Sequence, residues 1–304
     1  MRFPFYRLNR LCTLRFVALA LGLIFLQTLA NAAERNPMIK IMSFNIRYGT
    51  ADDRHNSWPE RRNFVIETIQ NYDPDLFGGQ EVLNFQAVFL QELLQEYSFH
   101  GIGREDGREK GEFVPIFFRT SRFQLVDAGH FWLSEQPNVP GSVSWDSSMT
   151  RMVSWVLLDD LEDDSDIPIY FANTHFDHRG RQARLQSAKL IRRMRDKFDV
   201  EYPAILTGDF NFTEDSEAYK VLTNADQNSF VYDHFIDSYR VIYPRRSPHE
   251  ATLSRFGNHR DGSRIDFVFH SGHFNTINAF IDHTQEAGRN PSDHYPVTAT
   301  LRLR

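Results

Sequence analysis

Short apolar runs alternate with amphipathic segments along most of the chain. Runs that are rich in Ile, Val, Leu and Phe, and that are bounded by Gly, Pro or Asp, predict strands. The pair Thr120-Ser121 separates two of these runs, so we expect the two flanking strands to pair with each other. The expected strands cover residues 38–47, 76–79, 113–119, 123–132, 151–158, 167–174, 204–207, 265–270, 274–281 and 296–303.

Other segments carry helical patterns. Ser57 and Glu60 have the spacing of a capping box, which predicts that a helix begins there. In the next helical segment Phe85, Phe89 and Leu93 recur about one turn apart, so we expect them to form its buried face. The polar stretch 233–262 supports no assignment. Further helices are expected over residues 180–198 and 216–222.

Strands, hairpins and helices follow one another without an internal repeat, a low-complexity tract or a linker. This order predicts an α/β fold in which two mixed sheets pack face to face with helices on the outside. The composition allows a substantial core, because 41% of the 304 residues are hydrophobic and 27 are Phe. Cys12 is the only cysteine, so a core and not a disulfide network must stabilise the fold.

The first 32 residues resemble a secretory signal peptide. Four arginines and no acidic residue precede an apolar run over residues 16–29, and Ala30-Asn31-Ala32 fits a cleavage site. The run is short for a membrane span, although an uncleaved anchor is the alternative. We therefore expect residues 33–304 to form the mature domain, secreted or periplasmic, without a stable membrane anchor. Loss of the four arginines changes the formal net charge from −6 to −10, which argues against a broad nucleic-acid-binding surface but not against a local basic groove.

Several apolar runs end in polar residues that can take part in chemistry. In Ala204–Phe212, AILTGDFNF, Asp209 and Asn211 stand two apart, so their side chains emerge side by side if the segment is extended. A tight turn is the alternative, since Gly, Asp and Asn are common in turns. Ligands bind at the carboxyl ends of strands in α/β sheets, so we expect the polar residues to share one edge. They are Asn45, Glu81, His175, Asp209, Asn211, Asp266, Asp293 and His294.

The residue types in this set indicate a particular chemistry. Carboxylate and amide oxygens without cysteine favour Mg²⁺, or Mn²⁺ in its place, over a structural zinc. A histidine that is held by an aspartate can bind or protonate a phosphoryl oxygen. The set therefore predicts metal-assisted hydrolysis of a phosphoester. The sequence contains no Gly-rich phosphate loop, HExxH or GxSxG, so P-loop, zincin and serine-hydrolase chemistry have no support.

In order and spacing, the same residues resemble the endonuclease/exonuclease/phosphatase (DNase I-like) superfamily over residues 39–303. The resemblance implies a four-layered α/β sandwich with the site at the sheet edge, and we expect a monomer. The most specific part of the resemblance is the separation of the GDFN and SDH motifs, together with the QE motif upstream. The motifs are Phe44-Asn45, Gln80-Glu81, Asn173–Asp177, Gly208–Asn211, Ile265-Asp266 and Ser292–His294.

The resemblance also implies roles for the metal site and the attacking water. Glu81 would bind the catalytic Mg²⁺, with Asn45 beside it and Asp293 contributing. Asp209 would activate or orient the attacking water, and Asn211 would position the phosphate. The metal would offset part of the charge that grows on the transferring group.

Two histidines would contact the phosphate itself. The resemblance implies that His294, oriented by Asp266, stabilises the phosphoryl oxygens, and that His175 contacts the phosphate from the other side. Further residues have two open interpretations, contact with substrate or packing and ion pairing within the fold. They are Arg47, Arg151, His178, Arg184, Trp58 and Trp145.

The expected function is a secreted, Mg²⁺-dependent phosphoesterase that hydrolyses a phosphodiester, with nucleic acid or nucleotides among the candidate substrates. The first alternative is a phosphatase of a small or lipid-headgroup phosphoester, which the acidic net charge favours. The second is a non-catalytic binding module, against which the complete set of site residues argues. The superfamily shares its catalytic set across substrates, so the motifs do not decide among them.

Overall fold

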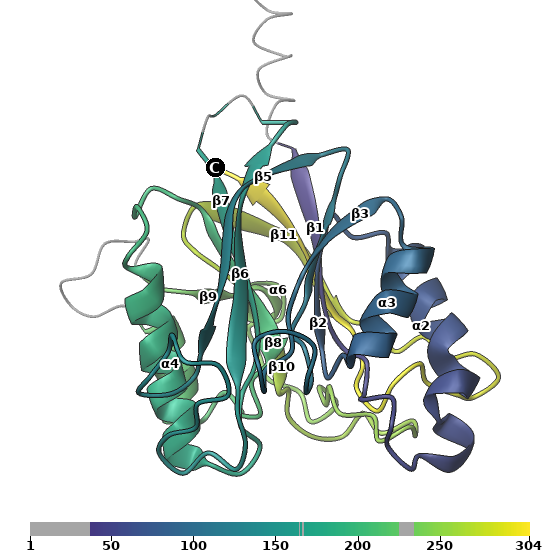
Figure 1. Ribbon diagram of the computed structural model, residues 1–304. Coiled ribbons are helices and arrows are strands. Elements are labelled where there is room, and N and C mark those ends of the chain that lie inside the picture. Colours follow the sequence, from purple (N-terminus) through teal and green to yellow (C-terminus); the bar gives the residue numbers. More distant parts are fainter. Residues whose placement is uncertain (1–36, 164, 166, 225–233) are drawn as a thin grey trace, which may run out of the picture.

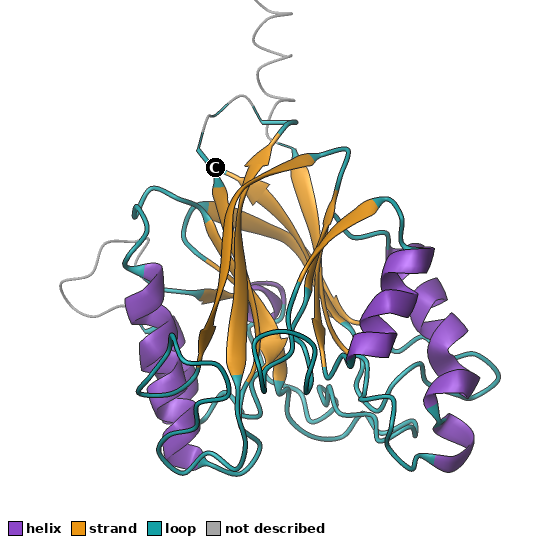
Figure 2. Ribbon diagram, in the orientation of Figure 1, coloured by secondary structure: helices purple, strands orange, loops and turns teal. Residues whose placement is uncertain are grey.

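Two six-stranded β-sheets pack face to face, and helices cover their outer faces (Figures 1 and 2). This arrangement is the α/β sandwich that the sequence predicts. The computed structural model describes residues 37–163, 165, 167–224 and 234–304. The expected signal peptide over residues 1–32 lies outside the described residues. Among the described residues, no helix combines the length and the apolar character that crossing a membrane requires.

The first sheet contains both ends of the described chain. One pair of its strands, the first and second along the chain, is parallel, and the other neighbours are antiparallel. Its strands are β1 (Met38–Asn45), β2 (Leu76–Gln80), β3 (Tyr97–His100), β4 (Ile116–Arg119), β11 (Phe274–Ile281) and β12 (Val297–Leu303). Their order across the sheet is β11-β12-β1-β2-β4-β3.

The second sheet is built from the middle of the chain. Its strands are β5 (Phe123–Trp132), β6 (Met152–Asp160), β7 (Ile169–His175), β8 (Ala204–Asp209), β9 (Ile236–Asp237) and β10 (Asp266–His270). The order is β5-β6-β7-β8-β10-β9, and β7 with β8 is its parallel pair. Each sheet thus has a parallel pair near its centre, and such a pair requires a crossover connection.

Helices supply these crossovers and cover the sheets. The crossover from β1 to β2 contains α2 (Trp58–Tyr72), and the crossover from β7 to β8 contains α4 (Arg181–Arg195). Figure 1 shows α2 and α3 (Asn84–Leu93) on one side of the molecule and α4 on the other. α2 begins where the sequence predicts, although the Ser57 side chain makes no capping hydrogen bond. The described residues also form three short elements, η1 (Arg54–Asn56), α5 (Glu217–Thr223) and α6 (Ser238–Ile242).

Apolar side chains fill the space between the sheets. Ile41 and Leu76 of the first sheet and Phe171, Ile205 and Val268 of the second are each at most 2% exposed. Full burial of such a side chain contributes roughly 1.5–3 kcal/mol. Two further apolar clusters lie under the outer helices, one beneath α2 and α3 and one beneath α4 and α5. The core therefore stabilises the fold without disulfides.

The expected pairing of residues 113–119 with residues 123–132 is wrong. The chain crosses from the first sheet to the second at this point, because β4 pairs with β2 and β3 whereas β5 pairs with β6. Arg122 lies at the crossing. Its guanidinium bonds Asp160 at 3.0 and 2.8 Å, and it lies 3.1 Å from Asp75 beside the other sheet. This buried arginine links the two layers.

The expected buried face of α3 is also wrong. Phe85 and Leu93 are 46% and 43% exposed, whereas Gln86 and Leu90 are buried. The Gln86 side chain accepts a 2.8 Å hydrogen bond from the Gly49 backbone N–H, which fixes that face of the helix inward. The buried face of α3 is therefore formed by Gln86, Ala87 and Leu90, and Phe89 packs partly buried against the same cluster.

Candidate active site

The polar strand ends that the sequence singles out meet at one edge of the two sheets, the lower edge in Figure 1. In the first sheet β1 ends at Asn45, and Glu81 directly follows β2. In the second sheet β7 ends at His175 and β8 ends at Asp209. Both parallel pairs run toward this edge, so their carboxyl ends bring the four side chains together.

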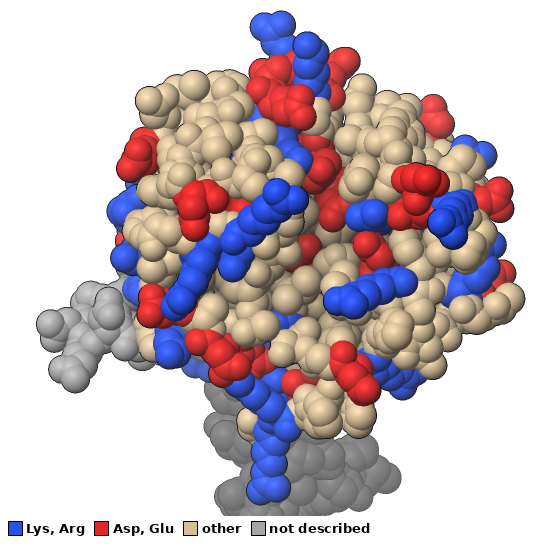
Figure 3. All heavy atoms as spheres, turned by 90° about the horizontal axis from the view of Figure 1, so that it is seen from below, with Lys and Arg blue, Asp and Glu red and all other residues tan. Residues whose placement is uncertain are grey.

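Antiparallel strands bring the remaining residues to the same edge. Asp266 begins β10 and lies opposite Asp209 in the ladder. Asp293 and His294 precede β12, which runs antiparallel to β1. Figure 3 looks onto this face and shows acidic side chains in a central hollow with Lys and Arg around it.

Three of the residues form a compact set of potential metal ligands. Glu81, Asp209 and His294 each offer one atom, and these atoms lie within 4.8 Å of one another. The Asn45 Nδ2 donates to Glu81 Oε1 and to Asp209 Oδ2, at 3.1 Å in each case. The side-chain amide of Asn45 thus holds the two carboxylates close together. Such a pair suits Mg²⁺, which takes one or two carboxylates and completes its coordination shell with water and phosphate. The donor set therefore fits a hard divalent cation.

Of the two alternatives for the GDFN segment, the structure shows the tight turn and not an extended strand through Asn211. β8 runs to Asp209, and the Asn211 backbone N–H then donates to Asp209 Oδ1 at 3.0 Å. Asn211 has a φ of 49°, and Glu81 has a φ of 58°. Left-handed backbone at such residues costs on the order of 1–3 kcal/mol and clusters at functional sites. The turn thus presents the side chains of Asp209 and Asn211 at the sheet edge.

His294 and Asp266 form a buried pair. The His294 Nδ1 lies 2.9 Å from Asp266 Oδ2, and its Nε2 lies 3.8 Å from Asp209 Oδ2. Burial alone would lower the pKa of His294, but the charge and hydrogen bond of Asp266, with Asp209 nearby, raise that pKa well above its ordinary value. A histidine must be neutral to ligate a metal. The raised pKa of His294 therefore favours a protonated ring, which leaves the carboxylates of the compact set as the potential metal ligands.

Asp209 lies at the centre of the site and is 1% exposed. Burial, followed by the charge of Asp266, raises the pKa of Asp209 to about 7, although His294 acts in the opposite sense. A carboxylate with a pKa near neutrality can accept a proton from water. The neighbouring His175 places its Nε2 3.4 Å from Asp209 Oδ2.

Behind His175 lie Glu112 and Arg104, which the sequence does not single out, together with Arg151 and His178, for which it leaves two interpretations open. The His175 Nδ1 lies 3.8 Å from Glu112 Oε2, and Arg104 donates two 2.8 Å hydrogen bonds to Glu112. Arg151 is buried, and its Nη2 lies 3.2 Å from the His178 Nδ1. Burial, followed by the charges of Arg151 and Arg104, lowers the pKa of His175 well below its ordinary value, so the ring is neutral.

Asp293 lies beside the compact set and not within it. Its Oδ2 is 3.6 Å from the Arg47 Nη1, and Arg47 also donates two 3.0 Å hydrogen bonds to Asp53. Of the two interpretations of Arg47, ion pairing within the fold is the one that these contacts support. The pairs also fix the loop that follows Asn45.

Three further residues could contact substrate or could pack and pair within the fold. Trp58 is 4% exposed and packs in the core beneath α2. Trp145 is partly buried against the core of the second sheet. Arg184 donates to the backbone oxygen of Asp177 at 2.8 Å, which orients it, and no acidic partner of Arg184 is found among the described residues.

A buried polar bridge joins the two sheets just behind the site. The Asn173 Oδ1 accepts hydrogen bonds from Gln80 Nε2 at 2.7 Å and from Thr207 Oγ1 at 3.0 Å. Gly78 permits this approach, because a Cβ there would lie 2.3 Å from the Thr207 Oγ1. The bridge sets the spacing between the strands that carry Glu81 and Asp209.

The two packed mixed sheets, the outer helices and a carboxylate–histidine site at the shared strand edge define a DNase I-like α/β sandwich. The model of the endonuclease/exonuclease/phosphatase family matches residues 42–294. The chain belongs to this family, whose members hydrolyse phosphoesters.

Solved structures show the same fold at appreciable identity. An endonuclease/exonuclease/phosphatase from Bacteroides vulgatus is 33% identical, covers 88% of this chain and 100% of its own, and has a TM-score of 0.79. A mannosyl-6-phosphatase from Bacteroides thetaiotaomicron is also 33% identical, covers 86% of this chain and 99% of its own, and has a TM-score of 0.76.

Curated relatives are more distant. Rat nocturnin is 22% identical over 306 residues, which is 90% of this chain and 66% of nocturnin. An uncharacterized mimivirus protein is 23% identical over 281 residues, which is 80% of this chain and 40% of that protein. The chain thus spans less than two thirds of the length of either protein.

Proposed function

We propose that this protein is a Mg²⁺-dependent phosphoesterase. The observation that carries the proposal is the convergence of Glu81, Asp209 and His294 within 4.8 Å, with Asn45 donating to both carboxylates. Membership of a family of phosphoester hydrolases supports it. A binding module would not require a base, a charged histidine and a set of metal ligands at one point, so the arrangement favours catalysis.

In the proposed reaction the side chains have separate tasks. Asp209, with a pKa of about 7, accepts a proton from the attacking water. Asn211 positions the phosphate. His294, held by Asp266, places positive charge beside the phosphoryl oxygens as negative charge grows there. The neutral His175 contacts the phosphate from the other side.

Glu81 is the residue that would hold the Mg²⁺, with Asn45 and Asp293 beside it. Glu81 lies beside Asp209 in the compact set, and it is the carboxylate there that has no role as a base. When bound, the cation would polarise a phosphoryl oxygen as a Lewis acid. Mn²⁺ has the same preference for oxygen ligands, so we expect it to substitute.

The number of ester bonds in the substrate is a separate question. The sequence alone favours a diester as the first candidate. A phosphomonoester is the second candidate, and a specific observation favours it: the Bacteroides thetaiotaomicron protein at 33% identity is a mannosyl-6-phosphatase. We therefore propose a monoester with a small organic substituent, and the first assay includes both ester types.

We further propose that the mature chain acts outside the cytoplasm. The proposal rests on the basic and apolar pattern of residues 1–32. Fractionation of cells that express the whole chain, with amino-terminal sequencing of the product, tests it. A product that keeps its first 32 residues would contradict the cleavage.

The proposed activity is tested with two chromogenic esters, p-nitrophenyl phosphate and bis-p-nitrophenyl phosphate. Each is offered to the protein with Mg²⁺, with Mn²⁺ and with EDTA. We expect turnover that requires the metal, faster on the monoester. Faster turnover of the diester would restore the nuclease or phosphodiesterase hypothesis, and turnover that persists in EDTA would contradict the metal site.

A further inference from the structure

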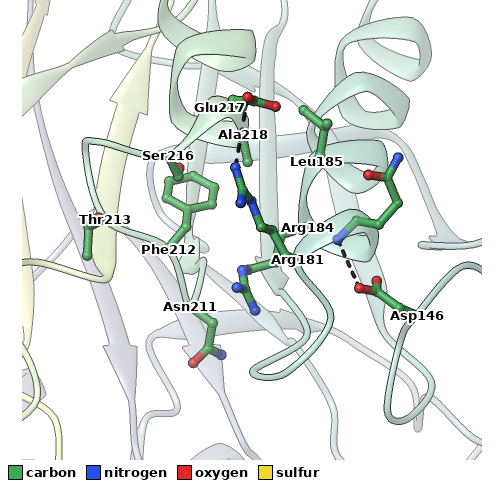
Figure 4. A pocket seen from close by; sticks show the side chains of 11 residues that line it. Asp146, Arg181, Arg184, Leu185, Asn211, Phe212, Thr213, Ser216, Glu217 and Ala218 are labelled. Carbon is green, nitrogen blue, oxygen red and sulfur yellow. Dashed lines mark hydrogen bonds and ion pairs between the residues drawn. The ribbon is translucent and has the colours of Figure 1, made fainter.

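A cavity of about 570 Å³ lies beside the candidate active site, between the start of α4 and the segment that leads into α5. Asn211, which belongs to the site, also lines the cavity. Figure 4 shows Asn211 at one end of the cavity and Glu217 at the other. A volume in this range can hold a small ligand. A group attached to the phosphate can therefore extend from the site into the cavity.

Most charged groups of the cavity are already engaged. Arg181 lies 3.9 Å from Glu217. Asp146 accepts hydrogen bonds from the backbone N–H groups of Gln182 at 3.1 Å and Ala183 at 2.6 Å, which satisfy its charge at the start of α4. These groups shape the walls and contribute little net charge.

Arg184 is the exception among the charged residues of the cavity. Its Nη1 donates to the backbone oxygen of Asp177 at 2.8 Å, which fixes the direction of the guanidinium. Within the described part of the chain, no ion pair joins Arg184 to a carboxylate. A guanidinium carries five N–H donors, so Arg184 has donors left for a ligand.

The rest of the lining indicates which ligand these donors would meet. The ring of Phe212 is 3% exposed and packs against Phe176 and Phe210, so it offers no face for stacking a base. The cavity lining contains two arginines and two carboxylates, so their formal charges cancel. This disfavours binding of a second phosphate group in the cavity. Thr213 and Gln182 add uncharged polar groups. Such a wall matches a neutral group with several hydroxyls.

We propose that this cavity binds a hydroxyl-rich, uncharged substituent of the phosphoester, such as a sugar ring, and that Arg184 is its principal hydrogen-bond donor. The inference rests on the proposed function, because the phosphate must sit at Asp209 and His294. It assigns a substrate class, the phosphomonoesters of sugars or similar polyols, to that site.

The test compares Arg184→Met with a matched control, Lys189→Met, which changes an exposed residue of α4 outside the cavity. For each variant, kcat/KM is measured with mannose 6-phosphate, glucose 6-phosphate, fructose 1,6-bisphosphate and p-nitrophenyl phosphate. We expect Arg184→Met to lower kcat/KM about 10- to 100-fold for the hexose monophosphates, the range for a hydrogen bond from a charged donor. The change for p-nitrophenyl phosphate should stay under about threefold, and Lys189→Met should change neither.

Three results would overturn the inference: equal losses on all substrates, no loss on the hexose phosphates, or a wild-type preference for the bisphosphate. If the wild type hydrolyses none of these esters, the proposed function fails, and binding then tests the cavity. Calorimetry with mannose 6-phosphate and the Asp209→Asn variant, with and without Arg184→Met, gives that test. Binding that is absent, or that Arg184→Met leaves unchanged, would refute the cavity's role by itself.

Discussion

Glu214 offers a quantitative test of a charge network between the segments that flank β8 and β10. Its side chain is 10% exposed and bonds Arg240 at 2.7 and 2.9 Å, Arg264 at 3.1 Å and Arg246 at 3.1 Å. Arg264 is completely buried and also bonds Asp237 at 3.0 Å. Glu214 thus joins the segment after β8 to the segment before β10.

The size of the effect follows from the protonation of Glu214. Burial works against its charged form, but hydrogen bonds and charges from Arg240 and Arg264 prevail and lower the pKa of Glu214 from 4.5 to about 2. A carboxyl group whose pKa is lower in the folded state than in the unfolded state stabilises the fold at pH values above its unfolded-state pKa. This contribution is lost as the pH falls through its folded-state pKa. At about 1.36 kcal/mol for each pKa unit, the contribution is on the order of 3 kcal/mol at pH 7 and about 1 kcal/mol at pH 3.

Urea unfolding of wild type and Glu214→Gln at both pH values measures this contribution. We expect the variant to lose about 3 kcal/mol at pH 7 and markedly less at pH 3. Asp215→Asn is the control, because Asp215 is 76% exposed and pairs with Arg246 at the surface. It should change stability by less than about 1 kcal/mol. An equal loss for Glu214→Gln at both pH values would refute the electrostatic explanation.

Two further variants test the site. Glu81→Gln removes one carboxylate ligand, so the Mg²⁺ concentration for half-maximal activity should rise about tenfold or more; an unchanged Mg²⁺ titration would place the cation elsewhere. His294→Ala should lower kcat by about 10²- to 10³-fold, because it removes the cation beside the phosphoryl oxygens. Circular dichroism checks that this variant is folded, and turnover close to wild type in a folded sample would argue against the role of His294.

Much of the site could be predicted from short segments of sequence, for a topological reason. Asn45, Glu81, His175 and Asp209 each stand at or just after the end of an apolar run that forms a strand. The strands of each parallel pair end at the same edge, so a local signal is enough to bring these residues together. The roles of these residues stay predictions.

Glu112 could not be predicted in the same way. It lies in an irregular segment between β3 and β4 that has no period and no motif. Its contact with His175 joins residues that are far apart in the chain and depends on how the two sheets face each other. The short strands β3 and β9 and the helix α6 were missed as well, because such short elements show no period.

The two errors of the fold prediction have tertiary causes. A short turn between apolar strands usually indicates a hairpin, but the buried bonds of Arg122 to Asp160 fix a crossing between sheets instead. In α3 the large side chains Phe85 and Phe89 dominate the apolar pattern, whereas the buried face carries Gln86, whose side chain bonds the backbone of Gly49. Neither partner is close in sequence.

Asp209 is the residue that we propose to activate water at a metal-dependent site. The most direct test is the rate of phosphoester hydrolysis by wild type and by Asp209→Asn, each with Mg²⁺ and with EDTA, on samples with matching thermal midpoints. We predict that wild-type turnover requires Mg²⁺ and that Asp209→Asn is slower by about 10²- to 10⁴-fold, the usual contribution of a general base. A folded Asp209→Asn protein that retains Mg²⁺-dependent turnover within tenfold of wild type would contradict the claim.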